Sequence, residues 1–503
     1  MPDFLGIDAG TTSTKSAFFN KSGRMLAVAR AEYELLTPAP AIVECDAETY
    51  WRACCAVVRQ VVAQSGVAPA AIATLAISSQ AETLVLLDAA GAPTRRVIVW
   101  LDNRAVEEAA AIAGHFGTEA MFRISGQPEV VPTWPACKIL WVQRNEPAVF
   151  AATAKFLLLE DYLLYRLTGA YVTELALQSG SLLVDINTRQ WFQPMLDYLG
   201  VGPERFGRLV EPGAPIGQLD PQGAAEAGLD PATLAVAGAL DQTIGALGAG
   251  NLRPGLVSET TGGALAVVAT TDRPYFDPDR RLPCFYHARP GLYCLFPWGQ
   301  TAGMALKWFR DEFFAAEALA AQQAGLDAYD LMTAAAGRVP PGCDGLTVLP
   351  NLEGAFTPEY NPQARAEEDG ATLRHGRGHF VPGLMEAVAY MLKRQLDLVE
   401  GMGFPVTEIR SIGGGARSPL WLQIKADVTG KMIHTVQSEE SACLGAALLG
   451  AVAAGCYADL ESAAAAMVHL GRTIEPSGIH AADYAAGYAR YCALYERLAP
   501  LFV

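Results

Sequence analysis

Charged side chains are scarce in this chain. Asp, Glu, Lys and Arg make up only 18% of its 503 residues, and the formal net charge is −16. A protein with so few cations, and with an excess of anions, is a poor partner for nucleic acid or for an anionic membrane. An anionic small molecule would have to be bound by local hydrogen-bond donors and a metal ion, because the overall field would repel it.

The ten cysteines do not form a C-x-x-C motif, and the adjacent pair Cys54-Cys55 is isolated in the sequence. We therefore expect reduced, mostly buried thiols. Hydrophobic runs long enough to cross a bilayer are also missing. The most apolar stretch, residues 442–454, consists largely of Ala, Gly and Leu and predicts a closely packed buried helix. With no basic and apolar leader before the first strand, we expect a cytoplasmic protein.

The P-loop motif G-x-x-x-x-G-K-[ST] is absent as well. What the chain has instead is an apolar run over residues 4–7 that ends at Asp8 and turns through Ala9-Gly10-Thr11-Thr12-Ser13-Thr14-Lys15. Such a turn presents backbone N–H groups, hydroxyls and an ammonium to a polyphosphate, with a carboxylate placed for its metal. Taken alone, the same residues also fit an ordinary hairpin turn.

The length predicts two domains with mixed α/β structure. Strands separated by turns are expected over residues 4–36, a helix over 47–64, and further strands over 72–78, 83–87 and 96–100. This alternation of strands and helices indicates layered α/β packing.

The opening motif recurs about half the chain later. The strand-like run at 256–259 enters the Thr/Gly turn Thr260-Thr261-Gly262-Gly263 and leaves through 264–269. Two such units suggest two similar domains that face each other across a cleft and each donate a phosphate-binding hairpin. We place the boundary near residue 250, which gives an N-terminal domain at 1–250 and a C-terminal domain at 251–503.

Two further strand ends carry chemistry. The apolar run 236–240 ends at Asp241-Gln242, where a carboxylate is well placed to accept a proton from a hydroxyl, although it could equally cap the following helix. The run 409–412 leads into Gly413-Gly414-Gly415, which allows close approach of a flat or anionic ligand beside the helix that begins near Pro419.

In this order the motifs resemble those of the FGGY carbohydrate kinases, of the sugar kinase, actin and hsp70 superfamily. The resemblance extends from about residue 3 to residue 455 and includes Trp100-Leu101-Asp102-Asn103-Arg104, the segment 138–145 and the segment 354–364. It implies two ribonuclease-H-like (actin-like ATPase) domains flanking a central cleft, with ATP and Mg²⁺ bound there. The implied reaction is phosphoryl transfer to a hydroxyl of a small sugar or polyol.

The resemblance also implies a role for individual residues. Asp8 would hold the metal through water and Asp241 would be the catalytic base. The residues implied to contact the nucleotide are Thr11, Thr12, Ser13 and Lys15 at the terminal phosphates, Thr261, Gly262 and Gly303 at the phosphates from the second domain, and Gly414, Gly415 and Ser418 at the adenosine.

The acceptor segment is Gln80-Ala81-Glu82-Thr83. It is similar to the Gln-Arg-Glu-Thr of glycerol kinases, with alanine replacing arginine, while other segments are more similar to the pentulose kinases. We expect Gln80, Glu82 and Gln242 to bind the acceptor. Trp134 would either line the sugar site or simply pack, and Asp102 and Arg104 would form a structural ion pair.

These observations predict an ATP-dependent kinase for a ketopentose, similar in organisation to the xylulokinases. A kinase for glycerol or another polyol is the alternative within the family. The alternative from another class is an actin-fold ATP-dependent switch that binds no sugar. We expect no nucleic-acid or membrane partner and a possible homodimer.

Overall fold

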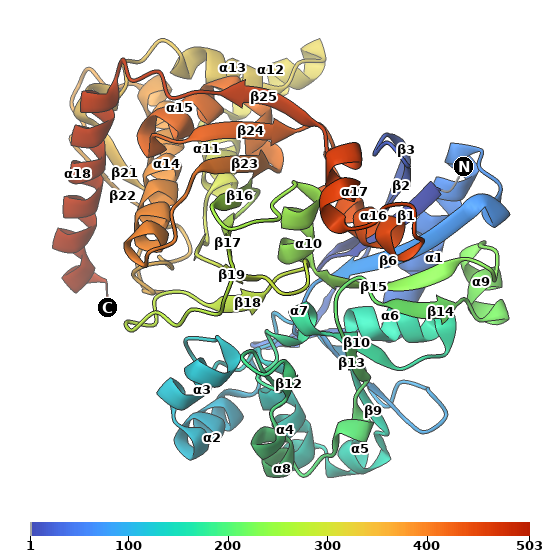
Figure 1. Cartoon of the computed structure of the whole chain (residues 1–503). Helices are drawn as coiled ribbons and strands as arrows, with labels where there is room; N and C mark the ends of the chain where they lie inside the picture. The colour runs from blue at the N-terminus through green and yellow to red at the C-terminus, as the bar shows by residue number, and fades with distance from the viewer. Residues whose placement is uncertain (1–2, 503) are drawn as a thin grey trace. The chain divides into compact units, whose positions relative to one another are not determined.

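The computed structural model describes residues 3–502, which form two compact units (Figure 1). Unit 1 comprises residues 3–253, 270–294 and 440–469, and unit 2 comprises residues 254–269, 295–439 and 470–502. Each unit therefore consists of three segments of the chain. The two segments of unit 1 that come from the C-terminal half add a β-hairpin and two helices to it.

The main sheet of unit 1 has six strands in the order β14-β15-β6-β1-β2-β3. β1 pairs with β2 and β2 with β3 in antiparallel fashion, whereas β1, β6 and β15 run parallel to one another. The strands are β1 (Asp3–Ala9), β2 (Ser13–Asn20), β3 (Met25–Glu32), β6 (Ile72–Ser79), β14 (Pro215–Gln218) and β15 (Leu234–Leu240).

Helices cover both faces of this sheet. Because successive side chains of a strand point to opposite faces, Leu5 and Ile7 join a buried cluster with α1, while Gly6 faces α16. A Cβ atom at Gly6 would lie 2.0 Å from the carbonyl oxygen of Cys443, so only glycine allows α16 to approach this closely. The helices around the sheet are α1 (Ala47–Ser65), α6 (Leu159–Thr168), α9 (Pro221–Ala227), α10 (Asp241–Gly248), α16 (Ser441–Ala453) and α17 (Leu460–Met467).

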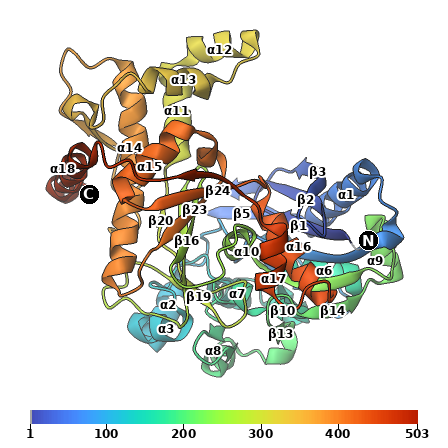
Figure 2. The same ribbon diagram turned by 45° about the horizontal axis from the view of Figure 1, so that its top comes forward.

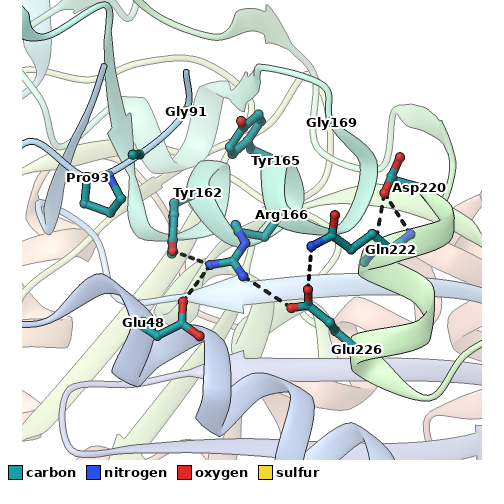
Figure 3. Close-up of a pocket in the computed structure, with 12 residues that line it drawn as sticks. Glu48, Gly91, Pro93, Tyr162, Tyr165, Arg166, Gly169, Asp220, Gln222 and Glu226 are labelled. Carbon is teal, nitrogen blue, oxygen red and sulfur yellow. Dashed lines mark hydrogen bonds and ion pairs between the residues drawn. The ribbon is translucent and has the colours of Figure 1, made fainter. Parts of the chain in front are cut away.

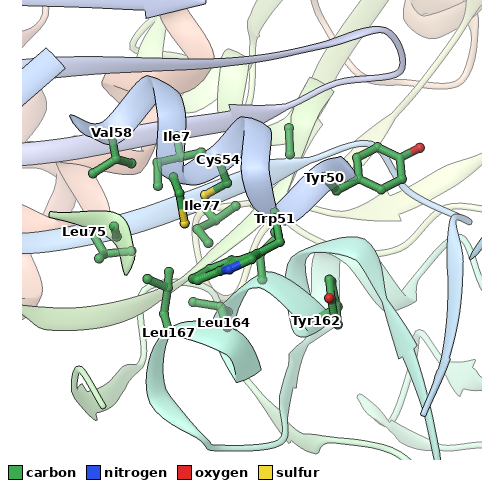
Figure 4. Close-up of a cluster of buried hydrophobic side chains, with 14 of the residues drawn as sticks. Ile7, Tyr50, Trp51, Cys54, Val58, Leu75, Ile77, Tyr162, Leu164 and Leu167 are labelled. Atoms are coloured by element: carbon green, nitrogen blue, oxygen red, sulfur yellow. The ribbon is translucent and has the colours of Figure 1, made fainter. Parts of the chain in front are cut away.

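Both views show α16 against β1 (Figures 1 and 2). The expectation of a closely packed helix over residues 442–454 is therefore confirmed. On the opposite face, Trp51 and Cys54 of α1 pack with Ile7, Ile77 and apolar side chains of α6 (Figure 4). This core fixes the strands whose ends carry the predicted residues.

The rest of unit 1 is built around a five-stranded sheet with the order β4-β5-β8-β7-β9. Its strands are β4 (Leu36–Ala39), β5 (Ile42–Cys45), β7 (Leu84–Leu87), β8 (Val97–Ile98) and β9 (Lys155–Leu158). The associated helices are α2 (Val106–Phe116), α3 (Thr118–Ser125), α4 (Pro135–Asn145), α5 (Pro147–Ala152) and α8 (Gln193–Leu199). Short elements complete the unit: β10 (Val172–Glu174), α7 (Leu175–Gln178), β11 (Val184–Asp185), β12 (Gln190–Trp191), β13 (Arg208–Val210), β18 (Cys284–Tyr286) and β19 (Tyr293–Leu295).

Unit 2 repeats the pairing pattern of the first sheet. β16 forms an antiparallel hairpin with β17, β16 runs parallel to β23 and β23 to β24, and β25 closes the edge in antiparallel fashion. The strands are β16 (Leu256–Thr261), β17 (Leu265–Thr271), β20 (Trp298–Gly299), β21 (Thr347–Leu349), β22 (Glu367–Asp369), β23 (Glu408–Ile412), β24 (Met432–Val436) and β25 (Leu470–Ile474). The helices are α11 (Gly303–Phe313), α12 (Ala315–Ala324), α13 (Ala328–Ala336), α14 (Arg377–Gly401), α15 (Pro419–Thr429) and α18 (Ala481–Leu498). The recurrence read at 256–269 is thus a recurrence of topology.

All ten cysteines are free thiols, and eight of them are buried. Among residues 3–502, none of the helices combines the length and the hydropathy that a bilayer crossing requires.

Candidate functional site

In unit 1 the predicted residues meet at one edge of the main sheet. The parallel strands β1, β6 and β15 all end there, and the register pairs both Asp8 and Ala239 with Ser78. Since the carboxyl ends of adjacent parallel strands share an edge, Asp8, Gln80 and Asp241 are brought together although more than half of unit 1 separates the first from the last. This edge is the candidate acceptor and metal end of the site.

Asp8 is half-buried and accepts a hydrogen bond of 3.1 Å from the Ser78 hydroxyl. Burial raises the pKa of the Asp8 carboxyl, and Lys15, opposite it on β2, opposes that shift. The Lys15 ammonium itself forms an ion pair of 2.9 Å with Glu440, directly before α16. Sequence reasoning could not find Glu440, because only the packing of α16 brings it to the hairpin.

The turn between β1 and β2 is open at the surface. Gly10 N–H donates to the Ser13 carbonyl at 3.0 Å, which closes the turn. The Thr11 hydroxyl accepts from the Trp100 indole at 2.8 Å, while Thr12 is exposed and Ser13 is half-exposed. The turn therefore leaves hydroxyl and backbone donors available for an anionic ligand.

Asp241 is the first residue of α10. The N-cap position belongs to Leu240, so the carboxylate of Asp241 does not occupy it. Burial, and then the nearby Asp8 carboxylate, raise the pKa of Asp241 to about 7, while the Gln242 backbone N–H, which donates at 2.6 Å, opposes the shift. A carboxyl with a pKa near neutrality is suited to accept a proton from a hydroxyl.

We expect the Asp241 carboxyl of the ligand-free protein to titrate near pH 7, far above an ordinary aspartate. The Asp8→Asn variant should lower this midpoint, because it removes the like charge that disfavours ionisation. Carboxyl ¹³C NMR, with the signal assigned by its loss in Asp241→Asn, measures both values. Asp272→Asn, at an exposed position, is the control and should leave the midpoint unchanged. A wild-type midpoint near pH 4 would contradict the proposed environment.

The acceptor segment is held by two contacts. Gln80 is buried and its amide donates to the Tyr50 hydroxyl at 3.3 Å. Glu82 has a left-handed backbone with φ of 56°, and the Lys138 ammonium donates to its carbonyl at 2.8 Å and to the Val99 carbonyl at 2.9 Å. Because such a φ is unfavourable for a residue other than glycine, the contact from Lys138 supports the conformation that places the Glu82 side chain.

Two further residues from the sequence analysis make contacts inside unit 1. The Trp134 indole donates to the Glu129 carbonyl at 2.9 Å, and the ring packs against the cluster around α4. Arg104 and Asp102 form an ion pair of 2.7 Å, with the Asp102 side chain fully buried.

In unit 2 the second hairpin turn lies at the carboxyl end of β16. Gly262 is exposed, and α11 begins at Gly303, whose N–H donates to the Gly262 carbonyl at 2.9 Å. A Cβ atom at Gly303 would lie 2.3 Å from that carbonyl oxygen, so glycine is required for this contact. The Thr261 hydroxyl faces inward and donates to Glu259 at 2.7 Å, which leaves only the backbone of Thr261 for a phosphate.

The glycine-rich loop follows β23 beside the same hairpin. Gly413 has φ of 78°, and a Cβ atom at Gly415 would lie 2.6 Å from Cβ of Thr261. Gly414 is exposed, and the Ser418 hydroxyl accepts from Trp421 N–H at 3.3 Å and so caps α15. The phosphate turn and the loop predicted for adenosine are therefore neighbours within unit 2.

A buried ion pair lies beneath these two loops. The Lys425 ammonium of α15 is 2.7 Å from Glu259 of β16 and 2.7 Å from the Thr261 hydroxyl, and both charged side chains are 0% exposed. Ser411 of β23 donates to the same carboxylate. Sequence reasoning missed this network, because its members lie on three separate elements.

A pocket of about 460 Å³ lies elsewhere in unit 1, lined by residues of α1, α6 and α9 (Figure 3). Its lining contains none of the predicted site residues. Arg166 donates to Glu48 at 2.9 Å and to the Tyr162 hydroxyl at 2.8 Å, and reaches Glu226 at 3.3 Å. Since these groups satisfy one another, we do not assign the chemistry to this pocket.

Two sheets share an antiparallel hairpin, two further parallel strands and an antiparallel edge strand, and each has a Thr/Gly turn at the carboxyl end of the first hairpin strand. They define a two-domain actin-like ATPase fold. The N-terminal and C-terminal domain models of the FGGY family of carbohydrate kinases match residues 4–248 and 261–454. The chain belongs to this family of ATP-dependent carbohydrate kinases.

The most informative relatives differ in substrate. The chain is 31% identical to a gluconokinase of Bacillus licheniformis over 452 residues, which covers 90% of this chain and 87% of that protein. It is 28% identical to a xylulose kinase of Bacillus subtilis over 491 residues, with 98% and 96% covered. The crystal structure of a xylulose kinase from Rhodospirillum rubrum has a TM-score of 0.88 at 29% identity and covers 99% of both chains.

Proposed function

We propose that this chain transfers the γ-phosphate of ATP to a hydroxyl of an uncharged ketopentose. Asp241 would act as the base, and Gln80, Glu82 and Gln242 would bind the acceptor. The residues proposed to contact the nucleotide are Thr11, Thr12, Ser13 and Lys15 of unit 1, and the Thr261 backbone, Gly262, Gly303, Gly414, Gly415 and Ser418 of unit 2.

The electrostatics of the acceptor end carry this proposal. Burial, and then Asp8, raise the pKa of Asp241, and burial raises the pKa of Glu82 to about 8, with a further contribution from Asp241, so negative charge is disfavoured at this end of the site. A substrate with a carboxylate, such as gluconate, would add a further negative charge here. Two unit charges about 5 Å apart interact by roughly 3 kcal/mol at an effective dielectric constant of 20.

Lys138, the cation that interacts with Glu82, is not placed to bind an anionic acceptor. Lys138 is buried, both hydrogen bonds of its ammonium given above go to backbone carbonyls, and burial lowers its pKa. An ammonium held in this way supports the segment around Glu82 and is not presented to an acceptor. A neutral polyhydroxyl compound fits these surroundings better than a sugar acid.

The proposed chemistry depends mainly on positioning. Phosphoryl transfer passes through a loose transition state, so removal of the acceptor proton by Asp241 comes late and alignment of the acceptor hydroxyl contributes much of the rate. Burial keeps the Asp241 carboxylate basic enough to take that proton at neutral pH.

The donor set also fits Mg²⁺, the usual partner metal of this family. Mg²⁺ in phosphoryl-transfer sites is held by one or two carboxylates, with waters and phosphate oxygens as the other ligands. Asp8 would hold it through water, and the like-charge interaction with Asp241 would be relieved by a cation. Within residues 3–502 no cluster of three or more His, Cys, Asp or Glu could hold a metal, which agrees with so sparse a protein ligand set. Bound there, Mg²⁺ would supply neutralisation of phosphate charge.

A gluconate kinase is the second candidate, because a gluconokinase is 31% identical to the chain. Glycerol is the third. The similar segment of glycerol kinases has an arginine at the position of Ala81. Ala81 is buried and offers only a methyl group, so a short triol would find fewer hydrogen-bond donors here. The hypothesis of an actin-fold ATP-dependent switch that binds no sugar is not supported, because both matching family models describe carbohydrate kinases.

The experiment is an ADP-release assay with D-xylulose, D-ribulose, L-ribulose, pentitols, D-gluconate and glycerol. We expect kcat/KM for the best ketopentose to exceed that for gluconate and glycerol at least about tenfold. A higher kcat/KM for gluconate in the wild type would overturn the ketopentose assignment, and ADP release independent of every acceptor would overturn the sugar kinase.

A further inference from the structure

Two buried carboxyl groups lie behind the strand that ends at Asp241. Glu160 of α6 is 0% exposed and Glu174, which ends β10, is 1% exposed. The elements that carry them, α6, β10 and α7, pack against β15 (Figure 1). Burial of a carboxyl group costs free energy unless its oxygens form hydrogen bonds. The hydrogen-bond partners of these two groups are therefore informative.

Their partners are backbone N–H groups. Gly238 N–H of β15 donates to Glu160 Oε1 at 2.8 Å. Glu174 accepts from the Ala176 and Leu177 N–H groups at the start of α7. Only Glu160 therefore has a hydrogen bond to β15 among these contacts, and Gly238 lies three residues before Asp241.

The strand needs acceptors at this point, because its neighbour ends. β14 pairs with β15 only as far as Pro215 opposite Val236, and the loop before it adds two hydrogen bonds to Ala237. On the other side the register with β6 shifts between Val236 and Ala239. Within this shift the Gly238 N–H donates to a side-chain carboxyl, that of Glu160, and not to a strand carbonyl.

Gly238 is the residue that allows this irregularity. A Cβ atom there would lie 1.7 Å from the carbonyl oxygen of Ile77 on β6, so the strand presses directly on its parallel neighbour. Gly238 contacts β6, and its N–H donates to the Glu160 carboxyl. The two contacts together restrain the strand. The position of the next residues, including Asp241, depends on this restraint.

The ionisable groups that interact with Glu160 are the carboxyls of Glu174 and Asp161. Burial, and then Glu174 and Asp161, raise the pKa of Glu160 well above its usual range, and burial likewise raises the pKa of Glu174. Asp161 is 1% exposed and accepts from Leu158 N–H at 2.9 Å, so its carboxyl stabilises the start of α6. A proton retained on one acid of the pair relieves the repulsion, and a hydrogen-bond acceptor remains on the other.

We propose that Glu160 is a positioning residue for Asp241 and acts through the backbone of β15, because its carboxyl accepts from the Gly238 N–H where the register with β6 shifts. The proposal rests on the role of Asp241 as base. It requires an acceptor oxygen at the place of Glu160 Oε1, and it does not require the negative charge.

The test compares Glu160→Asp with Glu160→Gln. Glu160→Asp keeps the charge but withdraws the acceptor by one methylene, and we expect kcat to fall about 10- to 100-fold with the KM for ATP and for the acceptor within about threefold of the wild type. Glu160→Gln keeps an acceptor of the same length without the charge, and its kcat should stay within about threefold. Hydrogen exchange of the Gly238 and Leu240 amides should be faster in Glu160→Asp only. Thermal unfolding identifies a variant that has lost its fold.

Each outcome bears on the proposal. Equal kcat in the Asp and Gln variants, whether near the wild type or lowered alike, would overturn it, because then the acceptor position is not what matters. Unchanged exchange at Gly238 and Leu240 would overturn the link to β15. Asp241→Asn assayed beside them separates the two hypotheses: a nearly normal Asp241→Asn refutes the proposed base, whereas an impaired Asp241→Asn with a normal Glu160→Asp refutes only the positioning role.

Discussion

Asp241→Asn should lower kcat by about 10²- to 10⁴-fold, the usual contribution of a positioned general base. The amide has the shape of the carboxyl but cannot take the proton of the acceptor hydroxyl. This loss corresponds to roughly 3–5 kcal/mol of activation free energy. Binding of ATP should change little, because the residues proposed for the nucleoside lie in unit 2.

Steady-state kinetics with a saturating acceptor, together with calorimetric titration of a non-hydrolysable ATP analogue, measure the two quantities. Asp272→Asn is the matched control, since this side chain is 61% exposed and pairs only with its neighbour Arg273 among the ion pairs described here. The variant should retain wild-type turnover. A kcat of Asp241→Asn within tenfold of the wild type would remove Asp241 from the proton transfer.

Lys425→Met should destabilise unit 2 by about 3–5 kcal/mol. The substitution keeps the length of the side chain but leaves the Glu259 carboxylate buried without its cation. Its remaining donors, the Thr261 and Ser411 hydroxyls, cannot offset the desolvation of a full charge. Because this network supports the Thr/Gly turn and the start of α15, both segments should become less protected together.

Hydrogen exchange of peptides covering β16 and α15, combined with thermal unfolding, measures the local and global effects. The double variant Lys425→Met/Glu259→Gln should recover much of the loss, since the neutral amide still accepts from the two hydroxyls and no charge remains buried. Lys307→Met is the control: its ion pair with Asp311 is on the surface, with side chains 61% and 39% exposed, and should contribute less than about 1 kcal/mol. Equal destabilisation by Lys307→Met and Lys425→Met would show that burial of the pair does not matter.

The two units show how one topology can support different chemistry. In unit 1 the strand ends carry carboxylates, Asp8 and Asp241, whereas in unit 2 the equivalent edge carries glycines and a buried ion pair. The first arrangement suits a metal and an acceptor hydroxyl, and the second suits close approach of phosphates and a flat base. This difference lies in the residues at the strand ends and not in the fold.

The sequence alone determined the fold class and the elements that bear the site. Alternating apolar runs predicted β1, β2 and β3, the helix α1 and the strands before Asp241 and Gly413, because periodicity and turn residues are local properties. The order of the motifs was enough for the family, since each motif consists of consecutive residues.

Only the tertiary structure decided which side chains meet. Glu440 pairs with Lys15 across 425 positions, Lys425 with Glu259 across 166, and Glu160 reaches Gly238 across 78. No periodicity or spacing connects such residues, because their contact depends on how helices pack on sheets. The raised pKa of Asp241 has the same origin: a carboxyl becomes a base near neutral pH through burial and a neighbouring charge, and both exist only after the chain has folded.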